Sequence, residues 1–192
     1  FRKLFFGHET PPHQALMINA WEQTKPGDVT LTLIFPSSGK TTLAEDYFCY
    51  RLATDPDYRI MVGCEAQQLA QKILTRVKQR MEESGPFPKF VEQFGPFIPQ
   101  NMDGRASRQV WSANAFNVYK RQAYDERDFS MAGIGFGSNI VGTRTDHLHC
   151  DDLQSTKTIS QTEKMFDTFR QDWLSRPGES GITTINGTRV AD

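Results

Sequence analysis

One strand-to-helix turn constrains this chain more than any other feature. The run Val29–Phe35 is rich in apolar and β-branched residues and predicts a buried strand. The turn Pro36–Gly39 follows it, and a helix is expected from Lys40 to about Ala53. In such a turn, backbone N–H groups and the helix N-terminus form a cradle for phosphate groups. The sequence therefore predicts a phosphate-binding loop, with Lys40 near the surface.

The residue types in this turn are those that nucleotide phosphates require. Gly39 lets the backbone approach a phosphate with no Cβ in the way. Lys40 would reach the β- and γ-phosphates, and the Thr41 hydroxyl would coordinate Mg²⁺. The full motif has a glycine where this chain has Ile34, so only its second half matches. The nucleotide-binding residues expected from the turn are Pro36, Ser37, Ser38, Gly39, Lys40, Thr41 and Thr42.

Strand-like and helix-like segments alternate along most of the chain. Apolar residues recur at helical spacing over Glu65–Glu83, and strand-like runs occur at Tyr58–Gly63, Asp146–Cys150 and Gly181–Asn186. This alternation indicates an α/β fold, a mainly parallel sheet flanked by helices with right-handed crossovers. Together with the phosphate loop, it predicts a P-loop NTPase of the RecA-like branch. In that branch an extra strand, here Tyr58–Gly63, lies between the phosphate loop and the strand that carries the acidic residues.

Composition narrows the class of protein further. With 192 residues, 38% of them apolar, the chain is long enough for one domain with a sizeable core. A net charge of −1 excludes a surface that is basic throughout, though not a local basic patch. The longest apolar run is far shorter than the roughly 20 residues that span a bilayer, and the three cysteines lack metal-site spacing. We expect a single ATPase domain over residues 1–192, with a Pro-, Gly- and Phe-rich insertion around 84–104, as a fragment of a longer protein.

Two adjacent carboxylates end the strand-like run Asp146–Cys150. In a P-loop ATPase, an aspartate at this strand end holds the Mg²⁺ shell, and the next acidic residue polarises the attacking water. Asp151 and Asp152 have these positions, 111 residues and more after Lys40. An isolated Asp-Asp pair more commonly caps a strand or starts a turn, so the catalytic interpretation depends on the Lys40 turn.

His147 and His149 precede these carboxylates and suggest a metal site at first sight. Alternation along a strand sends both imidazoles to one face and Cys150 to the other. The chain shows no second cluster of ligand residues, so we expect structural histidines rather than zinc ligands.

Two further features have both a functional and an ordinary interpretation. Asn186 and Thr188 end the last strand, where a polar residue can sense the γ-phosphate, or simply mark the exit into a loop. Arg144 lies just before the carboxylate strand. It could act as an arginine finger on the nucleotide of a neighbouring subunit, or pair with a nearby acid such as Asp146.

Taken in order, these segments resemble the N-terminal packaging ATPase of the large terminase subunit of tailed bacteriophages. The similar segments span about residues 10–190 and are Pro12–Gln14, Phe35–Thr42, Asp57–Gly63, Gly135–Asp152 and Ile185–Arg189. The family often has an arginine in its phosphate loop, where this chain has Ser37 and Ser38. It usually has a glutamate where this chain has Asp152.

The resemblance implies a Mg²⁺-dependent ATPase that moves double-stranded DNA into a viral procapsid in the host cytoplasm. It implies a homo-oligomeric ring on the portal protein, a small terminase subunit as partner, and no membrane. The family's C-terminal nuclease is not expected in this chain. The implied roles are catalysis by Lys40, Asp152 and Arg144, metal binding by Thr41 and Asp151, a contact on the adenine side by Gln14, and coupling of hydrolysis to movement by Asn186 or Thr188.

Two other functions fit parts of the same pattern. A helicase-like, nucleic-acid-dependent ATPase would share the chemistry but needs a second half with further motifs, which this chain does not show. A non-catalytic nucleotide-binding module would share the loop, and ATP would then only order an assembly. Measured hydrolysis separates this module from the two enzymes.

Overall fold

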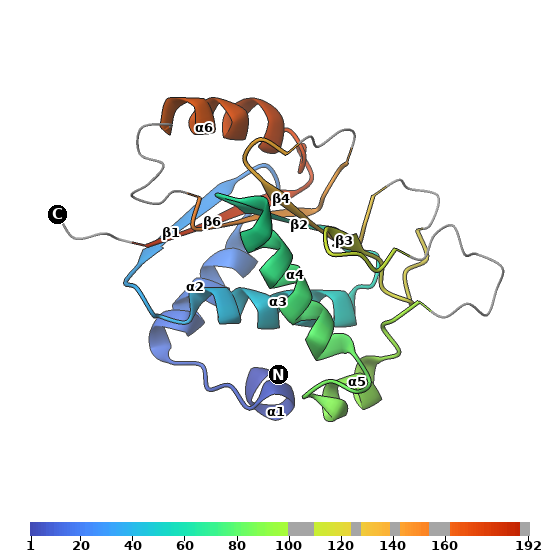
Figure 1. Ribbon diagram of the computed structural model, residues 1–192. Helices are drawn as coiled ribbons and strands as arrows, with labels where there is room; N and C mark the ends of the chain where they lie inside the picture. Colours follow the sequence, from blue (N-terminus) through green and yellow to red (C-terminus); the bar gives the residue numbers. More distant parts are fainter. Residues whose placement is uncertain (100–109, 124–127, 139–142, 154–161, 189–192) are drawn as a thin grey trace.

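A computed structural model describes residues 1–99, 110–123, 128–138, 143–153 and 162–188 of the chain. The described residues form a six-stranded sheet with the order β1-β6-β5-β2-β4-β3 (Figure 1). All neighbouring strands pair in parallel except β3, which pairs antiparallel with β4 at one edge. The strands are β1 Val29–Ile34, β2 Ile60–Cys64, β3 Ala115–Phe116, β4 Met131–Gly135, β5 His147–Asp151 and β6 Ile182–Thr188.

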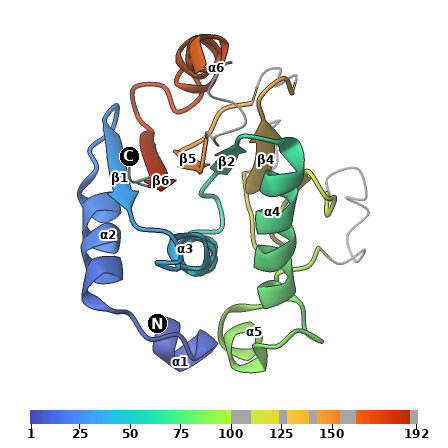
Figure 2. The same ribbon diagram turned by 60° about the vertical axis from the view of Figure 1, so that its left-hand side comes forward.

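Helices cover both faces of this sheet. They are α1 Arg2–Phe6, α2 Pro12–Gln23, α3 Lys40–Thr54, α4 Gln67–Met81, α5 Pro88–Phe94 and α6 Thr162–Thr168, which continues into the π-helical turn Phe169–Trp173. Figures 1 and 2 show α2, α3 and α4 along one face and α6 over the other, with α1 and α5 farther from the sheet. The expected α/β architecture, a mainly parallel sheet flanked by helices, is confirmed.

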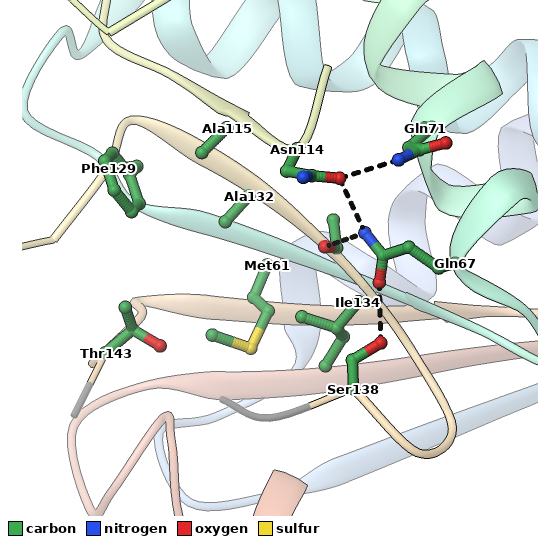
Figure 3. Close-up of a pocket in the computed structure, with 11 residues that line it drawn as sticks. Met61, Gln67, Gln71, Asn114, Ala115, Phe129, Ala132, Ile134, Ser138 and Thr143 are labelled. Carbon is green, nitrogen blue, oxygen red and sulfur yellow. Dashed lines mark hydrogen bonds between the residues drawn. The ribbon is translucent and has the colours of Figure 1, made fainter. Parts of the chain in front are cut away.

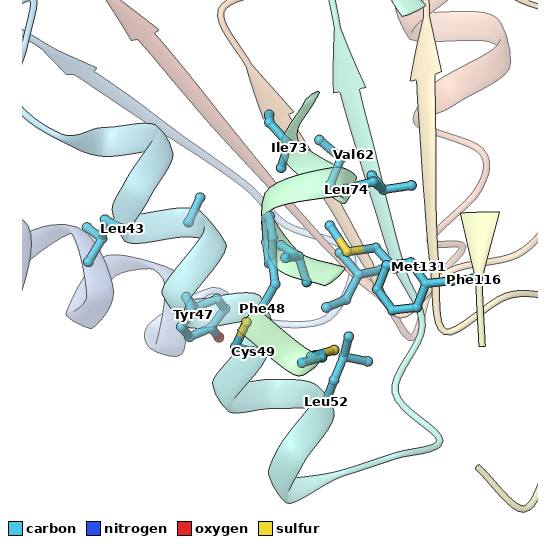
Figure 4. Close-up of a cluster of buried hydrophobic side chains, with 14 of the residues drawn as sticks. Leu43, Tyr47, Phe48, Cys49, Leu52, Val62, Ile73, Leu74, Phe116 and Met131 are labelled. Carbon is cyan, nitrogen blue, oxygen red and sulfur yellow. The ribbon is translucent and has the colours of Figure 1, made fainter. Parts of the chain in front are cut away.

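The main core fills the space between the sheet and helices α3 and α4. Its residues include Leu43, Tyr47, Phe48, Leu52, Val62, Ile73, Leu74, Phe116 and Met131 (Figure 4). A smaller cluster on the other face joins Met61, Ile134, Leu148, Cys150 and Trp173. Gly63 permits this second packing, because a Cβ there would lie 2.4 Å from the Trp173 ring.

The expected insertion around 84–104 is partly helical. Pro88–Phe94 forms α5, and its Phe90 is fully buried and stacks on Phe97 with ring centroids 5.0 Å apart. Residues 100–104 lie outside the described residues. Within the described part of the chain, no helix combines the length and apolar character needed to cross a bilayer.

The prediction of a buried strand at Val29–Phe35 is wrong. β1 lies at an edge of the sheet, and Leu31 and Leu33 are 58% and 61% exposed. Side chains alternate between the two faces of a strand. Ile34 packs towards the core, whereas Leu31 and Leu33 point to the opposite face and stay exposed. Apolar composition alone could not distinguish an edge strand from a central one, since the distinction depends on which strands pair.

We expect two leucine substitutions to differ sharply in their effect on stability. Leu148→Ala empties a fully buried position in the second cluster and should lower the free energy of unfolding by about 2–5 kcal/mol. Leu31→Thr, on the exposed face of β1, should change it by no more than about 0.5 kcal/mol. Urea unfolding of the two variants measures both values. Equal losses would show that the β1 face is covered in solution.

Candidate functional site

The turn predicted to bind phosphate, residues 35–39, connects β1 to α3 and is called the phosphate loop here. Its backbone is left-handed at Ser37, with φ 60°, and at Gly39, with φ 76°. For a serine this conformation costs on the order of 1 kcal/mol, so the surrounding contacts must maintain it. Within the loop, the Ser38 hydroxyl is buried and has no hydrogen-bond partner among the described residues. The loop thus holds both a strained backbone and an unused polar group.

Residues distant in sequence meet beside this loop. The Thr41 hydroxyl donates to Asp151 Oδ2 over 2.6 Å, across 110 positions of the chain. Lys40 Nζ lies 3.0 Å from Asp152 Oδ2 and donates to Thr188 Oγ1 over 2.7 Å. Thr188 Oγ1 in turn donates to Asp152 Oδ1 over 3.0 Å. The structure therefore brings together the ends of β1, β5 and β6 as one polar cluster.

The Lys40 side chain is more buried than its expected position near the surface suggested. It is 8% exposed, and its ammonium group is held between Asp152 and Thr188. Asp152 has a left-handed backbone, with φ 44°, and its side chain is 44% exposed. A ligand that needs the Lys40 charge must therefore compete with Asp152, whose carboxylate can turn towards solvent.

Asp151 has the opposite environment. Burial raises the pKa of its carboxyl group to about 6, since an ionised group loses its hydration there. The hydrogen bond from Thr41 and the charge of Lys40 act against this rise, and the charges of Asp152 and Glu45 add to it. Asp151 Oδ1 is buried and has no hydrogen-bond partner among the described residues. A buried carboxylate with an unused oxygen beside a threonine hydroxyl fits an oxygen-preferring cation such as Mg²⁺.

The structure separates the two polar residues expected at the end of the last strand. Thr188 reaches Lys40 and Asp152, as described above. Asn186 is fully buried, and its Nδ2 donates to His149 Nε2 over 3.3 Å. Asn186 Oδ1 has no hydrogen-bond partner among the described residues. Of the two, only Thr188 lies at the polar cluster.

Gln14 lies behind the phosphate loop. Its Nε2 donates to the carbonyl oxygen of Ser38 over 2.8 Å, and its Oε1 accepts from Arg2 Nη1 over 2.7 Å. Arg2 in turn pairs with Asp46, which is fully buried in α3. Sequence reasoning missed Arg2 and Asp46. The available signal was the carboxylates of Glu45 and Asp46 beside apolar residues in the helical pattern of α3, because a buried carboxylate requires a basic partner.

Arg144 does not lie with these residues. It precedes the first residue of β5, whereas Asp151 is the last residue of that strand. A parallel strand rises about 3.3 Å per residue, so seven residues separate the two by roughly 20 Å. Asp146 is paired with Arg59, with Nη2 and Oδ1 2.7 Å apart. Arg144 is exposed and cannot reach the phosphate loop of its own chain.

His147 and His149 are both fully buried and share the Thr184 hydroxyl at 2.7 Å. Burial lowers the pKa of His149 to about 3. Burial, followed by the nearby His149 and Arg51, lowers the pKa of His147 well below its ordinary range. Among the described residues, no group of three or more His, Cys, Asp or Glu side chains could hold a metal ion. The two imidazoles are therefore neutral parts of the core.

A cavity of about 460 Å³ lies near the β3 edge of the sheet (Figure 3). Gln67 bridges its wall, since it donates to Asn114 Oδ1 and Gly133 O and accepts from Gly135 N and Ser138 Oγ. None of its lining residues is titratable: they are Met61, Gln67, Gln71, Asn114, Ala115, Phe129, Ala132, Gly133, Ile134, Ser138 and Thr143. The described lining of this cavity thus consists of amide, hydroxyl and apolar groups.

The fold has counterparts among solved structures. The ATPase domain of the large terminase of Thermus phage P74-26, in a mutant form, superposes with a TM-score of 0.56 at 17% sequence identity, over 100% of this chain and 69% of that chain. A second structure of the same domain gives a TM-score of 0.54 at 16% identity, over 100% of this chain and 70% of that chain. The large terminase of bacteriophage HK97 gives 0.56 at 13% identity, over 96% of this chain and 34% of that chain.

No protein-family model matches the chain, and no curated protein matches its sequence. At identities of 13–17%, the likeness to these structures shows the fold. The resemblance to phage large terminase ATPase domains is confirmed at that level, and with it the P-loop NTPase fold.

We expect the neutral histidine pair to make stability depend on pH. In the unfolded chain a histidine binds a proton below about pH 6.5, whereas folded His147 does not. The unfolded state then holds more protons, so stability falls as the pH drops from 6.5 towards the lowered pKa of the folded state. His147→Gln should remove about 1.4 kcal/mol of the stability difference between pH 7.5 and pH 5.5. Urea unfolding at both pH values measures it, and an unchanged difference would contradict a neutral His147.

Proposed function

We propose that this chain is the ATPase core of a viral DNA-packaging motor. The main support is the convergence of Lys40, Thr41, Asp151, Asp152 and Thr188 at the carboxyl ends of β1, β5 and β6. Solved structures with the same fold are ATPase domains of large terminases, which adds support for this class of motor. The proposed substrate is ATP, bound at the turn between β1 and α3.

In this proposal, the loop backbone and Lys40 bind the β- and γ-phosphates. Without nucleotide, the Lys40 ammonium group contacts Asp152 and Thr188. When ATP binds, the γ-phosphate would replace Asp152 as the partner of this group. This exchange releases the Asp152 carboxylate. The Ser38 hydroxyl, which has no partner among the described residues, is a further donor for phosphate oxygens.

Thr41 and Asp151 are the residues that would hold Mg²⁺. The unused Asp151 Oδ1 and the adjacent Thr41 hydroxyl supply the oxygen ligands that this cation prefers. Bound Mg²⁺ would neutralise charge on the phosphate oxygens. Ionised Asp151, otherwise destabilised by burial, would gain a cationic partner there.

Asp152 is the proposed general base. Its carboxylate is partly exposed, so a water molecule can approach it, and its release from Lys40 would free it to accept a proton. Thr188 bonds both Lys40 and Asp152 and is the proposed coupling residue, because any change of partners there reaches β6 directly. Asn186 is buried behind it, against His149, and would support the strand rather than contact nucleotide.

The proposal extends to double-stranded DNA as the translocated substrate, to a homo-oligomeric ring on a portal protein, and to a small terminase subunit as partner. The terminase fold is the support for these partners. A helicase-like ATPase and a non-catalytic nucleotide-binding module remain the competing functions. Hydrolysis without DNA movement into capsids would favour the first, and nucleotide binding without hydrolysis would favour the second.

The two aspartates should differ in kinetic role. Asp151→Asn removes a metal ligand and should weaken binding of Mg²⁺ and nucleotide. Asp152→Asn should keep binding and lower kcat by about 10²–10⁴-fold, since a general base acts on turnover.

Lys40→Ala should abolish hydrolysis, and Lys25→Ala, at an exposed lysine, is its control. Calorimetric titration and phosphate release measure binding and rate. Equal hydrolysis by wild type and Lys40→Ala would refute the proposed function.

The isolated chain should be a slow ATPase that gains activity on assembly. No arginine lies in its phosphate loop, and Arg144 is too far from that loop to act within one chain. We therefore propose Arg144 as a finger in trans, an interaction worth about 10³–10⁵ in rate. Activity per subunit should rise with protein concentration, and Arg144→Ala should remove this rise without changing nucleotide affinity. Arg170→Ala, at another exposed arginine, is the control.

A high rate per subunit that stays constant down to monomeric concentrations would exclude a finger in trans. Sedimentation at the same concentrations establishes whether the chain is monomeric or assembled.

A further inference from the structure

A buried series of polar contacts connects the middle of α3 to the back of the phosphate loop. It starts at Asp46, which is fully buried and has three basic partners. Arg2 Nε donates to Asp46 Oδ2 over 2.8 Å, His8 Nδ1 lies 2.7 Å from the same oxygen, and Arg80 Nε donates to Oδ1 over 3.2 Å. Asp46 thereby anchors the N-terminal segment to α3, in the lower part of Figure 2.

Arg2 links Asp46 to Gln14. Its Nη1 donates to Gln14 Oε1 over 2.7 Å and also to Glu9 O and Thr10 Oγ1, at 3.1 and 3.2 Å. Because a guanidinium group only donates, it determines which end of the Gln14 amide faces it. The carbonyl oxygen of that amide faces Arg2, so the NH₂ group must face the loop.

At the loop, the Gln14 NH₂ group holds one peptide unit in a defined orientation. Nε2 donates to Ser38 O over 2.8 Å, and His13 Nε2 lies 3.2 Å from the same oxygen. In a trans peptide, C=O and N–H point in opposite directions. Holding Ser38 C=O towards Gln14 therefore turns the N–H of Gly39 to the other side of the loop. Glycine suits this position, because φ is 76° and a Cβ would lie 2.7 Å from Gln14 Nε2.

We propose that Gln14 is a positioning residue that holds the phosphate loop in its anion-binding conformation, with its amide oriented by Arg2 and Asp46. Both ends of the amide are engaged, and Gln14 is only 7% exposed, so little of the side chain is accessible to a nucleobase. The adenine contact that the sequence resemblance implied for Gln14 is the alternative that the following experiment tests. The inference rests on the proposed function, since it concerns the same loop.

Binding of two anions separates a positioning role from base recognition. ATP carries both a base and phosphates, whereas inorganic triphosphate carries phosphates alone. Gln14→Met keeps the volume and the neutral charge of the side chain but removes the donor to Ser38 O. It should weaken binding of ATP and of triphosphate by the same factor, about tenfold, since a lost buried hydrogen bond has that order of effect. Isothermal titration calorimetry of the full chain, well below its melting temperature, measures both affinities.

Two matched controls, Gln67→Met and Arg80→Lys, and a second test variant, Arg2→Lys, separate the positioning role from a general loss of stability. Gln67→Met removes another amide with several hydrogen bonds, none of them to the loop, and should leave both affinities unchanged. Arg2→Lys keeps the charge but loses the forked geometry that joins Asp46 to Gln14. It should lower the affinities for both anions by the same factor, smaller than in Gln14→Met. Arg80→Lys alters the same Asp46 cluster without a direct contact to Gln14 and should lower the affinity for neither anion.

A loss confined to ATP in Gln14→Met would overturn the inference and restore base recognition. Unchanged affinities for both anions would also overturn it. If Gln14→Met does not fold, Arg2→Lys decides by the same comparison of the two anions. If wild-type chain failed to bind triphosphate at all, the phosphate loop and the proposed function would fall, an outcome distinct from a wild type that binds and a variant that is unaffected.

Discussion

The parallel pairing of β1, β6 and β5 is the constraint on which the candidate site depends. The carboxyl ends of parallel strands meet at the same edge of a sheet. In this register Ile34 lies opposite Thr188, and Asn186 lies opposite Asp151. Lys40 and Thr41, which begin α3 directly after the loop, are thereby placed next to carboxylates more than a hundred residues away. No local preference of the chain could produce these contacts.

Burial then gives neighbouring groups different properties. Asp151 and Asp152 are adjacent in sequence, yet the first is buried beside Thr41 and the second is partly exposed beside Lys40. Desolvation raises the pKa of Asp151, while Asp152 stays accessible to water. Two identical side chains thus acquire the distinct environments that a metal ligand and a base require.

The same face of β5 and β6 carries a buried polar series farther from the carboxyl ends of these strands. His147, His149, Thr184 and Asn186 form one hydrogen-bonded series under α3. Asn186 donates to His149 Nε2, which leaves the His149 proton on Nδ1, towards Thr184. Neutral imidazoles satisfy this series without a buried charge, so the residues that suggested a metal site are core residues.

The sequence by itself determined the local elements and the chemistry of the loop. The pattern of apolar residues indicated the α/β alternation, and Gly39, Lys40 and Thr41 indicated phosphate binding, because both signals lie within a few consecutive residues. The expected burial of β1 was wrong, since it depends on neighbours that are distant in sequence, and the low exposure of Lys40 has the same cause.

Only the tertiary structure decided which strand lies at the edge, that Thr188 rather than Asn186 reaches Lys40, and that Asp146 pairs with Arg59. It also decided the place of Gln14, whose amide is engaged by Arg2 and the Ser38 carbonyl. The physical reason is common to all four. Strand order, burial and hydrogen-bond partners are set by contacts between distant segments, and these contacts exist only once the sheet has formed.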